Sequence, residues 1–354
     1  MRRANLKDVA DRAGVSIRTV SNVVNTPEVV ARPTRQRVLE AIEELGYRPN
    51  LAARQLRQGH REVIGLVVPE IDSPYFAELA ALVVRHAERM GWTVIVEQTD
   101  GDATREQQLL DGARGQGVDG IIFCPWAMTA EEVSRRATAP PVVMLGEQPG
   151  MGSVDRVAID NRGAALEAVH HLVALGRTRI AAVGLQPHLS NETARQRLAG
   201  YRAALVDVGL VAHPELEVPV ERLHHADGMG AMAGLLAKSK PDAVFCFTDQ
   251  LALGAIRTCA DQGVRVPEDI AVVGFDDIEV GRYSVPALTT VAPDKQRLAE
   301  LALTTLQERM ADSSLPGRDV VVPHLLVVRE SAPAAGSATR PARSELPSST
   351  PSGK

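Results

Sequence analysis

The amino-acid sequence predicts a small all-helical domain followed by a large α/β domain with two parallel sheets. Residues 1–61 contain short helical patterns and hold 12 Lys and Arg against 6 Asp and Glu, a net charge of +6. From Val63 onward, apolar runs of strand length alternate with amphipathic segments, which is typical of parallel sheets covered by helices on both faces. The chain after residue 61 has 27 basic and 38 acidic residues, a net charge of −11. This charge division suggests a polyanion-binding module, although a basic arm without a specific partner would give the same counts.

Three helices are expected in the amino-terminal region. Apolar residues recur with helical spacing over Leu6–Ala13, and a glycine then interrupts the pattern. Ser16 is a suitable N-cap for a second helix over Ile17–Asn25, and Thr34 for a third over about Arg35–Leu45. A helix, a tight glycine-containing turn and a second helix form the helix-turn-helix arrangement, which the third helix closes into a small core.

Two segments of the chain lack the apolar residues needed to fold alone. The basic segment LAARQLRQG should be a linker that gains helical order when something holds it. The segment after Ser331 is rich in Pro, Ala, Ser and Gly and should be disordered. The expected boundaries are 1–48 for the helical domain, 49–61 for the linker, 62–332 for the α/β domain and 333–354 for the tail.

The α/β domain has about 270 residues, which favours two lobes over a single sheet. Eight strands are expected, at Val63–Val68, Thr93–Glu97, Gly120–Cys124, Val142–Leu145, Val157–Ile159, Ile180–Val183, Ala243–Phe247 and Ile270–Gly274. Amphipathic helices lie between most of them, for example at Phe76–Met90, Ala164–Leu175, Arg195–Val208 and Gln250–Asp261. Ligands of such folds bind beyond the carboxyl ends of the strands, so we expect the site in the cleft between the lobes.

Composition argues against several classes of protein. Cys124, Cys246 and Cys259 are far apart and should be small core residues in a reducing compartment. No apolar segment resembles a secretory signal or is long enough to cross a bilayer. A cytoplasmic protein without a membrane partner is therefore expected.

No motif of an enzyme is found, and neither a cofactor nor a metal ion is expected. The glycine pattern at 115–120 follows a helix and precedes a strand, which is the reverse of a dinucleotide-binding fingerprint. The pairs His170-His171 and His224-His225 are sequence neighbours, so their side chains point in different directions and are not expected to share a metal ion. There is no nucleophile elbow and no paired-carboxylate motif.

The amino-terminal motifs have a specific likeness. LKDVADRAGVSIRTVSNVVN, TRQRVLEAIEELGYRPN and AARQL, in this order, strongly resemble the DNA-binding headpiece of the LacI family. The resemblance continues through IGLVVPEIDSPYFAEL, TARQRLAGY, VFCFTDQLALGAI and VPEDIAVVGFDDIE, and covers about residues 5 to 331. It implies an all-α helix-turn-helix headpiece joined to an α/β two-lobed periplasmic-binding-protein-like domain with doubly wound parallel sheets.

The resemblance implies that the second helix lies in the major groove and reads bases through Ile17, Arg18 and Asn22. Arginine can pair with guanine, asparagine with adenine, and isoleucine can contact a thymine methyl group. Phosphate contacts are expected from Ser16, Thr19, Ser21, Asn25 and Thr34. For Ser21 and Asn25 a solvated helix surface is the alternative. The helix should bury its other side through Val20, Val23 and Val24.

In the linker, the resemblance implies that Leu56 wedges between base pairs in the minor groove and kinks the duplex. Asn50, Ala53 and Arg57 would lie alongside it. The alternative is that Leu56 packs against the headpiece.

For the α/β domain, the resemblance implies that Arg197 and Asp276 clamp ligand hydroxyl groups. An arginine and a carboxylate placed across a cleft suit a polyol, which offers both acceptors and donors. Tyr75 and Phe76 match positions where an aromatic ring packs against the ligand, with core packing as the alternative. Glu147 and Thr248 fall at positions that line the pocket. Asp249 and Asp160 are expected to be helix N-caps rather than ligand contacts. Met229 stands where several relatives carry an aromatic residue that stacks on the ligand. The methionine favours a sugar over a purine.

These expectations combine into a homodimeric transcription regulator rather than an enzyme. Its two headpieces would bind half-sites of a near-palindromic double-stranded DNA operator within the nucleoid, since a two-fold protein matches a two-fold site. The default is a repressor of carbohydrate-utilisation genes with a sugar as effector. A purine or nucleoside sensor and a regulator acting with a corepressor remain open, and so does a solute-binding protein of a transport system, which would not explain the basic head. Relatives that form tetramers add a leucine-repeat helix that this tail lacks, so a dimer is expected.

Overall fold

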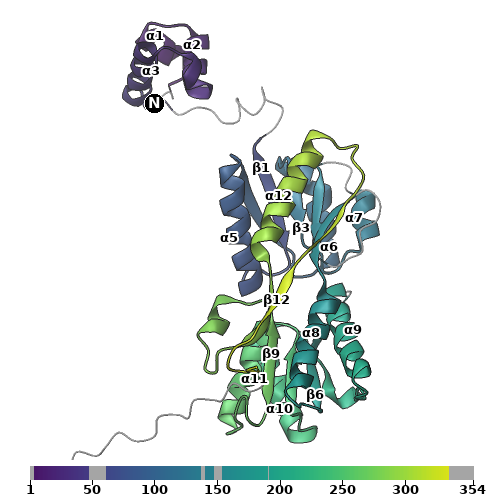
Figure 1. The fold of residues 1–354 in the computed structure, drawn as a ribbon. Coiled ribbons are helices and arrows are strands. Elements are labelled where there is room, and N and C mark those ends of the chain that lie inside the picture. The colour runs from purple at the N-terminus through teal and green to yellow at the C-terminus, as the bar shows by residue number, and fades with distance from the viewer. Residues whose placement is uncertain (1–3, 48–60, 137–139, 147–153, 190, 335–354) are drawn as a thin grey trace, which may run out of the picture. The chain divides into compact units, whose positions relative to one another are not determined.

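The computed structural model describes residues 4–47, 61–136, 140–146, 154–189 and 191–334. The chain forms two compact units, Met1–Arg61 and Glu62–Lys354, shown in Figure 1. The expected linker positions Asn50, Ala53, Leu56 and Arg57 lie outside the described residues. None of the helices within the described ranges combines the length and the apolar character that a membrane crossing requires.

The first unit contains α1 (Leu6–Ala13), α2 (Ile17–Asn25), the 3-10 turn η1 (Pro27–Val29) and α3 (Arg32–Glu44). The first two helices confirm the predicted bounds. The third starts earlier than expected, because proline at the first turn suits a helix start. Ala31 therefore stands at the N-cap, and the prediction that Thr34 caps the helix was wrong.

A small apolar core joins these three helices. Val9 and Ala10 of α1 pack with Val20 and Val23 of α2 and with Val38 of α3. The expectation that Val24 is also a core residue was wrong, because it is only half-buried and lies outside this cluster. This core orients α2 so that its amino-terminal turn faces solvent.

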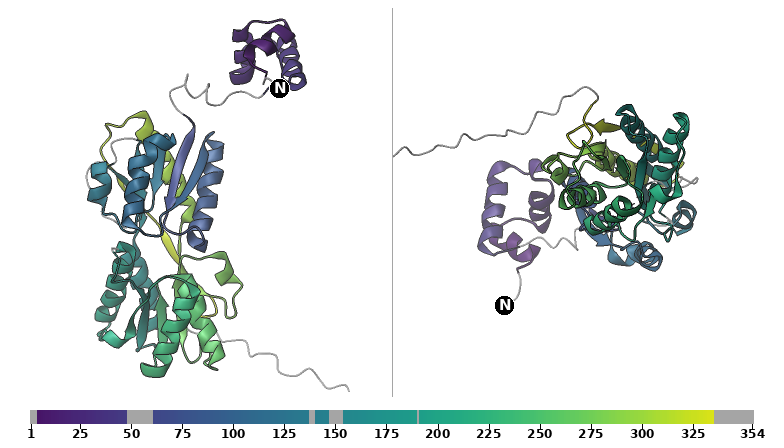
Figure 2. Two further views of the ribbon diagram at one scale, coloured as in Figure 1. Left: turned by 180° about the vertical axis from the view of Figure 1, so that it is seen from behind. Right: turned by 90° about the horizontal axis from the view of Figure 1, so that it is seen from below.

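The first lobe of the second unit is built on a six-stranded parallel sheet. Its strands, in spatial order, are β11 (Asp319–Val322), β5 (Asp155–Ile159), β4 (Val142–Leu145), β3 (Gly120–Phe123), β1 (Val63–Val68) and β2 (Thr93–Gln98). Helices α5 (Pro74–Arg89) and α12 (Lys295–Ala311) pack on one face, and α6 (Ala103–Gln116) and α7 (Ala130–Arg136) on the other. Figure 2 shows these layers from behind.

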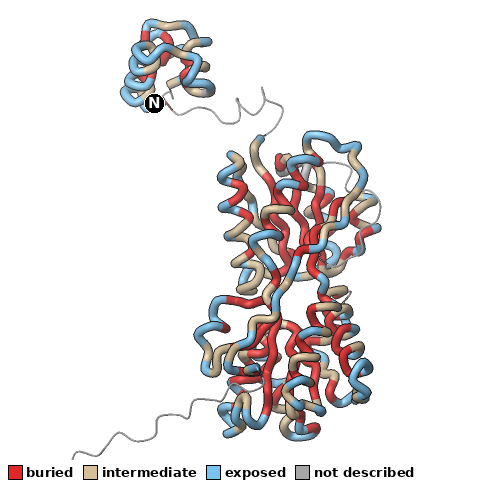
Figure 3. The backbone as a smooth tube through the Cα atoms, in the orientation of Figure 1, coloured by how far each residue is buried: buried red, intermediate tan, exposed pale blue. Residues whose placement is uncertain are grey.

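The second lobe repeats this plan. Its strands, in spatial order, are β12 (His324–Val327), β10 (Thr289–Pro293), β9 (Ala271–Phe275), β8 (Ala243–Cys246), β6 (Ile180–Leu185) and β7 (Glu217–Pro219). One face is covered by α8 (Asn161–Ala174) and α9 (Glu192–Asp207), the other by α10 (His225–Lys238) and α11 (Asp249–Asp261). Two 3-10 turns, η2 (Pro214–Leu216) and η3 (Glu279–Arg282), complete the lobe. The buried positions concentrate on the central strands of both lobes (Figure 3).

The predicted architecture of two parallel-rich, doubly wound sheets is confirmed. The sequence-based prediction omitted β7, β10, β11 and β12, and one pairing departs from it, because β12 runs antiparallel to β10. The chain crosses between the lobes three times, after β5, between β10 and α12, and between β11 and β12. The backbone N–H of Asp294 donates to the carbonyl of Pro323 at 3.2 Å, so two of these crossings are joined to each other.

Candidate functional site

A cleft opens between the two lobes at the carboxyl ends of their strands. It encloses about 850 Å³ of space free of protein atoms, including solvent at its mouth. Of the residues expected to contact a ligand, five line it: Tyr75, Phe76, Arg197, Thr248 and Asp276. Glu147 lies outside the described residues.

Arg197 is held rigidly at the base of the cleft. It lies on α9, is 6% exposed, and stacks on the ring of Phe275 with 3.5 Å between the guanidinium carbon and the ring centroid. Its Nε donates to Oδ1 of Asn161 at 2.7 Å, and its Nη1 donates to the carbonyl of Phe247. Its Nη2 lies 3.6 Å from Oδ1 of Asp276. Fixed arginines of this kind bind oxygen atoms with defined direction.

Asp276 follows β9 in a backbone conformation with φ of 113°, which non-glycine residues rarely adopt. Burial raises the pKa of its carboxyl to about 6, while Arg197 and Lys295 oppose that rise. Lys295 Nζ also donates to the backbone carbonyl of Asp276 at 2.9 Å. Arg197 and Asp276 thus belong to the same lobe and are neighbours on one wall, whereas the sequence suggested a pair placed across the cleft.

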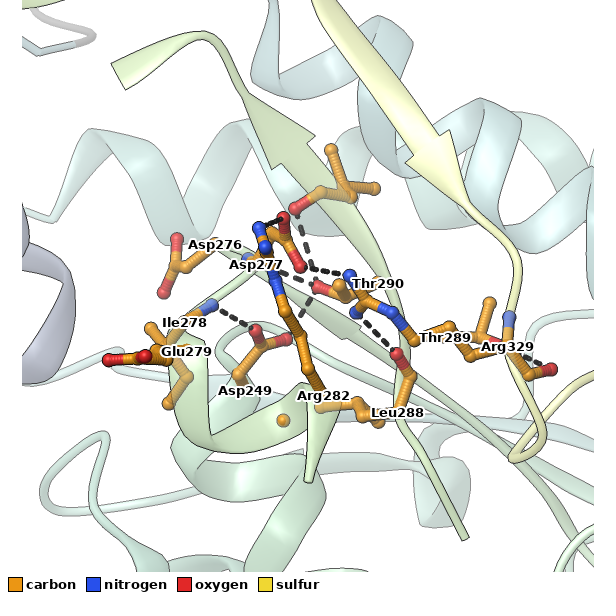
Figure 4. Close-up of polar contacts among 12 residues, drawn as sticks. Asp249, Asp276, Asp277, Ile278, Glu279, Arg282, Leu288, Thr289, Thr290 and Arg329 are labelled. Atoms are coloured by element: carbon orange, nitrogen blue, oxygen red, sulfur yellow. Dashed lines mark hydrogen bonds and ion pairs between the residues drawn. The ribbon is translucent and has the colours of Figure 1, made fainter. Parts of the chain in front are cut away.

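A polar network anchors the turn that follows Asp276 (Figure 4). Asp249 accepts from the hydroxyl of Thr290 at 2.5 Å and from the backbone N–H of Ile278 at 2.9 Å. Asp277 pairs with Arg282 and Arg329 at 2.8 and 2.6 Å, and these contacts hold the pKa of its carboxyl below the usual range. The turn is therefore bonded to α11, β10 and the chain beyond β12, and these contacts position Asp276 at the cleft.

Of the two aspartates expected to be helix caps, one is confirmed and the other was wrong. Asp160 caps α8, accepting from the backbone N–H of Gly163 at 2.8 Å. The cap of α11 is Thr248 rather than Asp249, since the Thr248 hydroxyl accepts from the N–H of Leu251 at 3.3 Å. Asp249 is the first helical residue and is fully buried within the network above. Met229 is 38% exposed and is not among the residues that line the cleft.

The first lobe contributes an aromatic wall. Tyr75 and Phe76 begin α5 and lie edge to face with 5.1 Å between ring centroids. Trp126 extends this wall from the loop after β3, 6.0 Å from Phe76. Sequence reasoning missed Trp126, although its position just beyond a buried strand, like that of Tyr75 beyond β1, could have indicated it.

The loop carrying Trp126 is held by one buried carboxylate. Glu106 of α6 is fully buried and accepts backbone N–H bonds from Trp126, Ala127 and Met128 at 2.8 to 3.2 Å. Burial raises the pKa of Glu106, and these three N–H groups oppose the rise. A single side chain therefore satisfies three consecutive donors and orders this part of the cleft.

Contacts join the lobes beside the cleft. His224 Nε2 lies 2.9 Å from Glu70 Oε2, which connects α10 to the loop after β1. Glu78 of α5 pairs with Lys295 and accepts from the backbone N–H of Glu279 at 2.8 Å. Asp72 brings a third ligand-type atom within 4.8 Å of Glu70 and His224, but Asp72 is exposed and the other two already bond to each other. We interpret this cluster as an inter-lobe contact.

The amino-terminal turn of α2 presents the residues expected to read DNA. Ser16 caps the helix by accepting from the N–H of Thr19 at 3.1 Å, and its hydroxyl also bonds that of Thr19. Ile17 is 49% exposed, and Arg18 is exposed beside it. An isoleucine exposed to this degree on a well-capped helix has no partner in the core of its own unit. The remaining expected contacts with described surroundings, Ser21, Asn22 and Thr34, are half-buried.

Comparison with known proteins identifies relatives of both units. Residues 5–50 match the family model described as bacterial regulatory proteins, lacI family, and residues 169–332 match that of a periplasmic binding protein-like domain. The HTH-type transcriptional repressor PurR of Erwinia tasmaniensis is 36% identical over 335 residues, covering 93% of this chain and 96% of that protein.

Two solved structures extend the likeness to the whole fold. The transcriptional regulator CelR in complex with cellobiose is 30% identical, with a TM-score of 0.69, over 93% of this chain and 100% of that one. The lac repressor dimer bound to operator and the anti-inducer ONPF is 29% identical, with a TM-score of 0.81, over 94% of this chain and 100% of that one.

Proposed function

The chain belongs to the LacI family of bacterial regulatory proteins, and from this membership we propose that it is a repressor whose operator affinity is switched by a sugar. Members of the family are ligand-responsive DNA-binding transcription regulators and not enzymes. The chain is accordingly such a regulator. Beyond family membership, we propose the class of effector, the form of the operator and the individual DNA and effector contacts.

The composition of the cleft walls carries the choice of a sugar. Arg197 is a donor and Asp276 an acceptor, and they are fixed side by side on one wall. A sugar hydroxyl can accept from the first and donate to the second. Phe76 and Trp126 on the other lobe offer apolar surface to the C–H face of a sugar ring. A relative of this fold is solved with cellobiose.

A purine is the second candidate effector. Repressors named PurR are among the relatives, and the same aromatic wall can stack on a flat base. Met229, expected from the sequence at a stacking position, does not line the cleft, so it does not decide between the two classes. Titrating the protein with cellobiose, ribose, hypoxanthine and guanine separates the two classes.

The switch has a structural basis in the contacts of Asp276. Lys295 is the first residue of α12 in the first lobe, yet its amine donates to the carbonyls of Asp276 and Asp277 in the second. An effector that pulls on Asp276 therefore also acts on α12 and, through Glu78, on α5. The effector can bias the lobes only by its difference in affinity for their two arrangements.

The DNA-binding part of the proposal uses α2. Ile17, Arg18 and Asn22 would read base edges in the major groove, while Ser16, Thr19, Ser21, Asn25 and Thr34 would contact phosphates. In a homodimer, paired linkers would place Leu56 in the minor groove, with Asn50, Ala53 and Arg57 alongside. The operator would then be a near-palindrome with a flexible central step. Domain boundaries at 48, 61 and 332 fit this division of labour.

The first experiment is selection of genomic fragments by the purified full chain at near-physiological salt, followed by sequencing. Recovery of a near-palindrome supports the proposal, and genes of sugar utilisation beside it support the effector class. Failure to enrich any fragment, with and without pools of sugars and purines, would contradict the operator proposal.

A further inference from the structure

Asn161 lies where the chain enters the second lobe. It is the first residue of α8, directly after β5 of the first lobe, and it lines the cleft. The residue is 1% exposed. Its Oδ1 accepts from Nε of Arg197 at 2.7 Å, whereas its Nδ2 is buried without a hydrogen-bond partner among the described residues. The amide oxygen is therefore hydrogen-bonded, whereas the amide nitrogen is not.

The contact with Arg197 fixes the orientation of the amide. A guanidinium group has only donors, so the amide oxygen must face it. A flipped amide would set two donors against each other, which removes the usual ambiguity between the two ends of an asparagine. Nδ2 therefore points away from Arg197 Nε with its two hydrogen atoms unmatched.

An unmatched buried donor in a folded protein requires an explanation, because leaving it unpaired is destabilising. Among the described residues, the other buried side-chain atoms in this condition belong to His86, His170 and Arg177. None of these three residues lines the cleft. Among the described residues with such an atom, Asn161 is the one that lines the cleft.

We propose that Asn161 is a specificity-determining effector contact, in which Nδ2 donates to an acceptor oxygen adjacent to the group bound by Arg197. This inference rests on the proposed function and narrows it. The ligand must carry two oxygen atoms on neighbouring carbons, one facing Arg197 and Asp276 and the other facing Asn161. A vicinal diol of a sugar meets that requirement.

The position of Asn161 also connects this contact to the crossing between the lobes. Helix α8 is packed tightly against α9, since a Cβ placed on Gly200 of α9 would lie 2.2 Å from the carbonyl of Arg162. The first turn of α8 therefore lies directly against the helix that carries Arg197. A ligand whose two oxygen atoms are bound by these two side chains is held by the second lobe at the point where the chain leaves the first lobe.

The test uses the full chain and calorimetric titration with ribose, glucose and cellobiose, and with monodeoxy analogues of whichever sugar binds best. Asn161→Asp keeps an acceptor for Arg197 and removes the donor. It should weaken binding of the parent sugar about 10- to 100-fold. It should change binding of one analogue, the one lacking the partner oxygen, less than about 2-fold. Arg162→Ala is the matched control, an exposed position on the same helix turn, and should bind as the unmodified chain does.

Each result decides something. Equal losses for the parent sugar and all analogues would show that Asn161 only positions Arg197, and would overturn the proposed contact, as would no loss at all. Asn161→Ala, with melting temperature recorded, replaces the first variant if that one does not fold. If the unmodified chain binds no sugar, the proposed effector class fails, and hypoxanthine against unsubstituted purine, which lacks the exocyclic oxygen, tests Asn161 in the same way. Binding of neither class overturns both proposals.

Discussion

Arg197 Nη2 and Asp276 Oδ1 lie 3.6 Å apart on one wall of the cleft, and the guanidinium stacks on the ring of Phe275 at the end of β9. The two groups are therefore already placed side by side as donor and acceptor before a ligand binds. Each is 6% exposed, so each depends on the other for compensation of its charge.

Replacing Arg197 should separate effector response from DNA binding. Arg197→Met keeps much of the length but leaves Asn161, Asp276 and the carbonyl of Phe247 without their donor. Effector affinity should fall more than about 100-fold, in line with the loss of a buried charged contact worth about 3–5 kcal/mol. Calorimetry measures the effector, and a gel shift without effector should give operator affinity within about 3-fold of the unmodified chain. A variant that still responds normally would place the effector elsewhere.

Effector binding should depend on pH through Asp276. The pKa of its carboxyl is raised to about 6, so the group is ionised above that value and protonated below it. A sugar hydroxyl that donates to the carboxylate favours the ionised form. Affinity should therefore be constant above about pH 7 and fall by up to about 10-fold per unit as pH drops through 6. Titrations from pH 5 to 8 measure this, and Asp276→Asn should bind weakly with a flat profile over the same range. An affinity that rises on acidification would contradict the assigned role.

Elements with strong local signals were predicted well. The bounds of α1 and α2 follow from helical spacing and capping residues, and those of β1 and β4 from unbroken apolar runs. Strands β7, β11 and β12 have three or four residues of mixed exposure, and no periodicity distinguishes such segments from loops. The pairing of β12 depends on where the chain crosses to the second lobe at Pro323, which is a tertiary property.

The arrangement of residues in the cleft also depends on tertiary structure and could be predicted only in part. Resemblance gave the positions of Arg197 and Asp276, but only the fold places both on the second lobe. Asn161 stands beside Asp160, whose role as a cap is the obvious use for a polar residue at a helix start. The effector contact proposed for it rests on the buried amide nitrogen, which has no partner among the described residues.

Arg18 should account for discrimination at one base pair of each half-site. Arg18→Ala removes a side chain that can bond guanine at two atoms, so the preference at that position should relax by about 1–3 kcal/mol. Fragment selection with the variant measures the base preference at every position. Arg37→Ala, an exposed arginine on α3, is the matched control and should leave the selected sequence unchanged. If Arg18→Ala retains the full base preference, a residue other than Arg18 reads this base pair.

Leu56 should act on the shape of the operator. Leu56→Ala shortens the side chain proposed to enter the minor groove, so operator affinity should fall about 10-fold and the bend of the DNA should decrease. Gel shifts of circularly permuted fragments measure both quantities. Effector affinity should not change, and Gln58→Ala in the same linker provides the comparison. An unchanged bend would favour packing of Leu56 against the headpiece.

Glu106 should govern the aromatic wall although it does not touch the cleft. Glu106→Gln leaves one oxygen where two oxygens accept from Trp126, Ala127 and Met128, and it turns an amide N–H₂ toward backbone donors. The loss of these bonds should cost about 1–3 kcal/mol in the free energy of unfolding, measured by urea denaturation.

The same substitution should loosen the loop that carries Trp126, so the emission of this tryptophan should shift to the red as water reaches it. Effector affinity should fall together with that shift, because the loop must then be ordered on binding. Glu131→Gln on α7, with its carboxylate largely exposed, is the control for changing a glutamate in the same lobe. If Glu106→Gln lowers stability but leaves both emission and effector affinity unchanged, Trp126 is not part of the binding wall, and the apolar contact with the ligand rests on Tyr75 and Phe76.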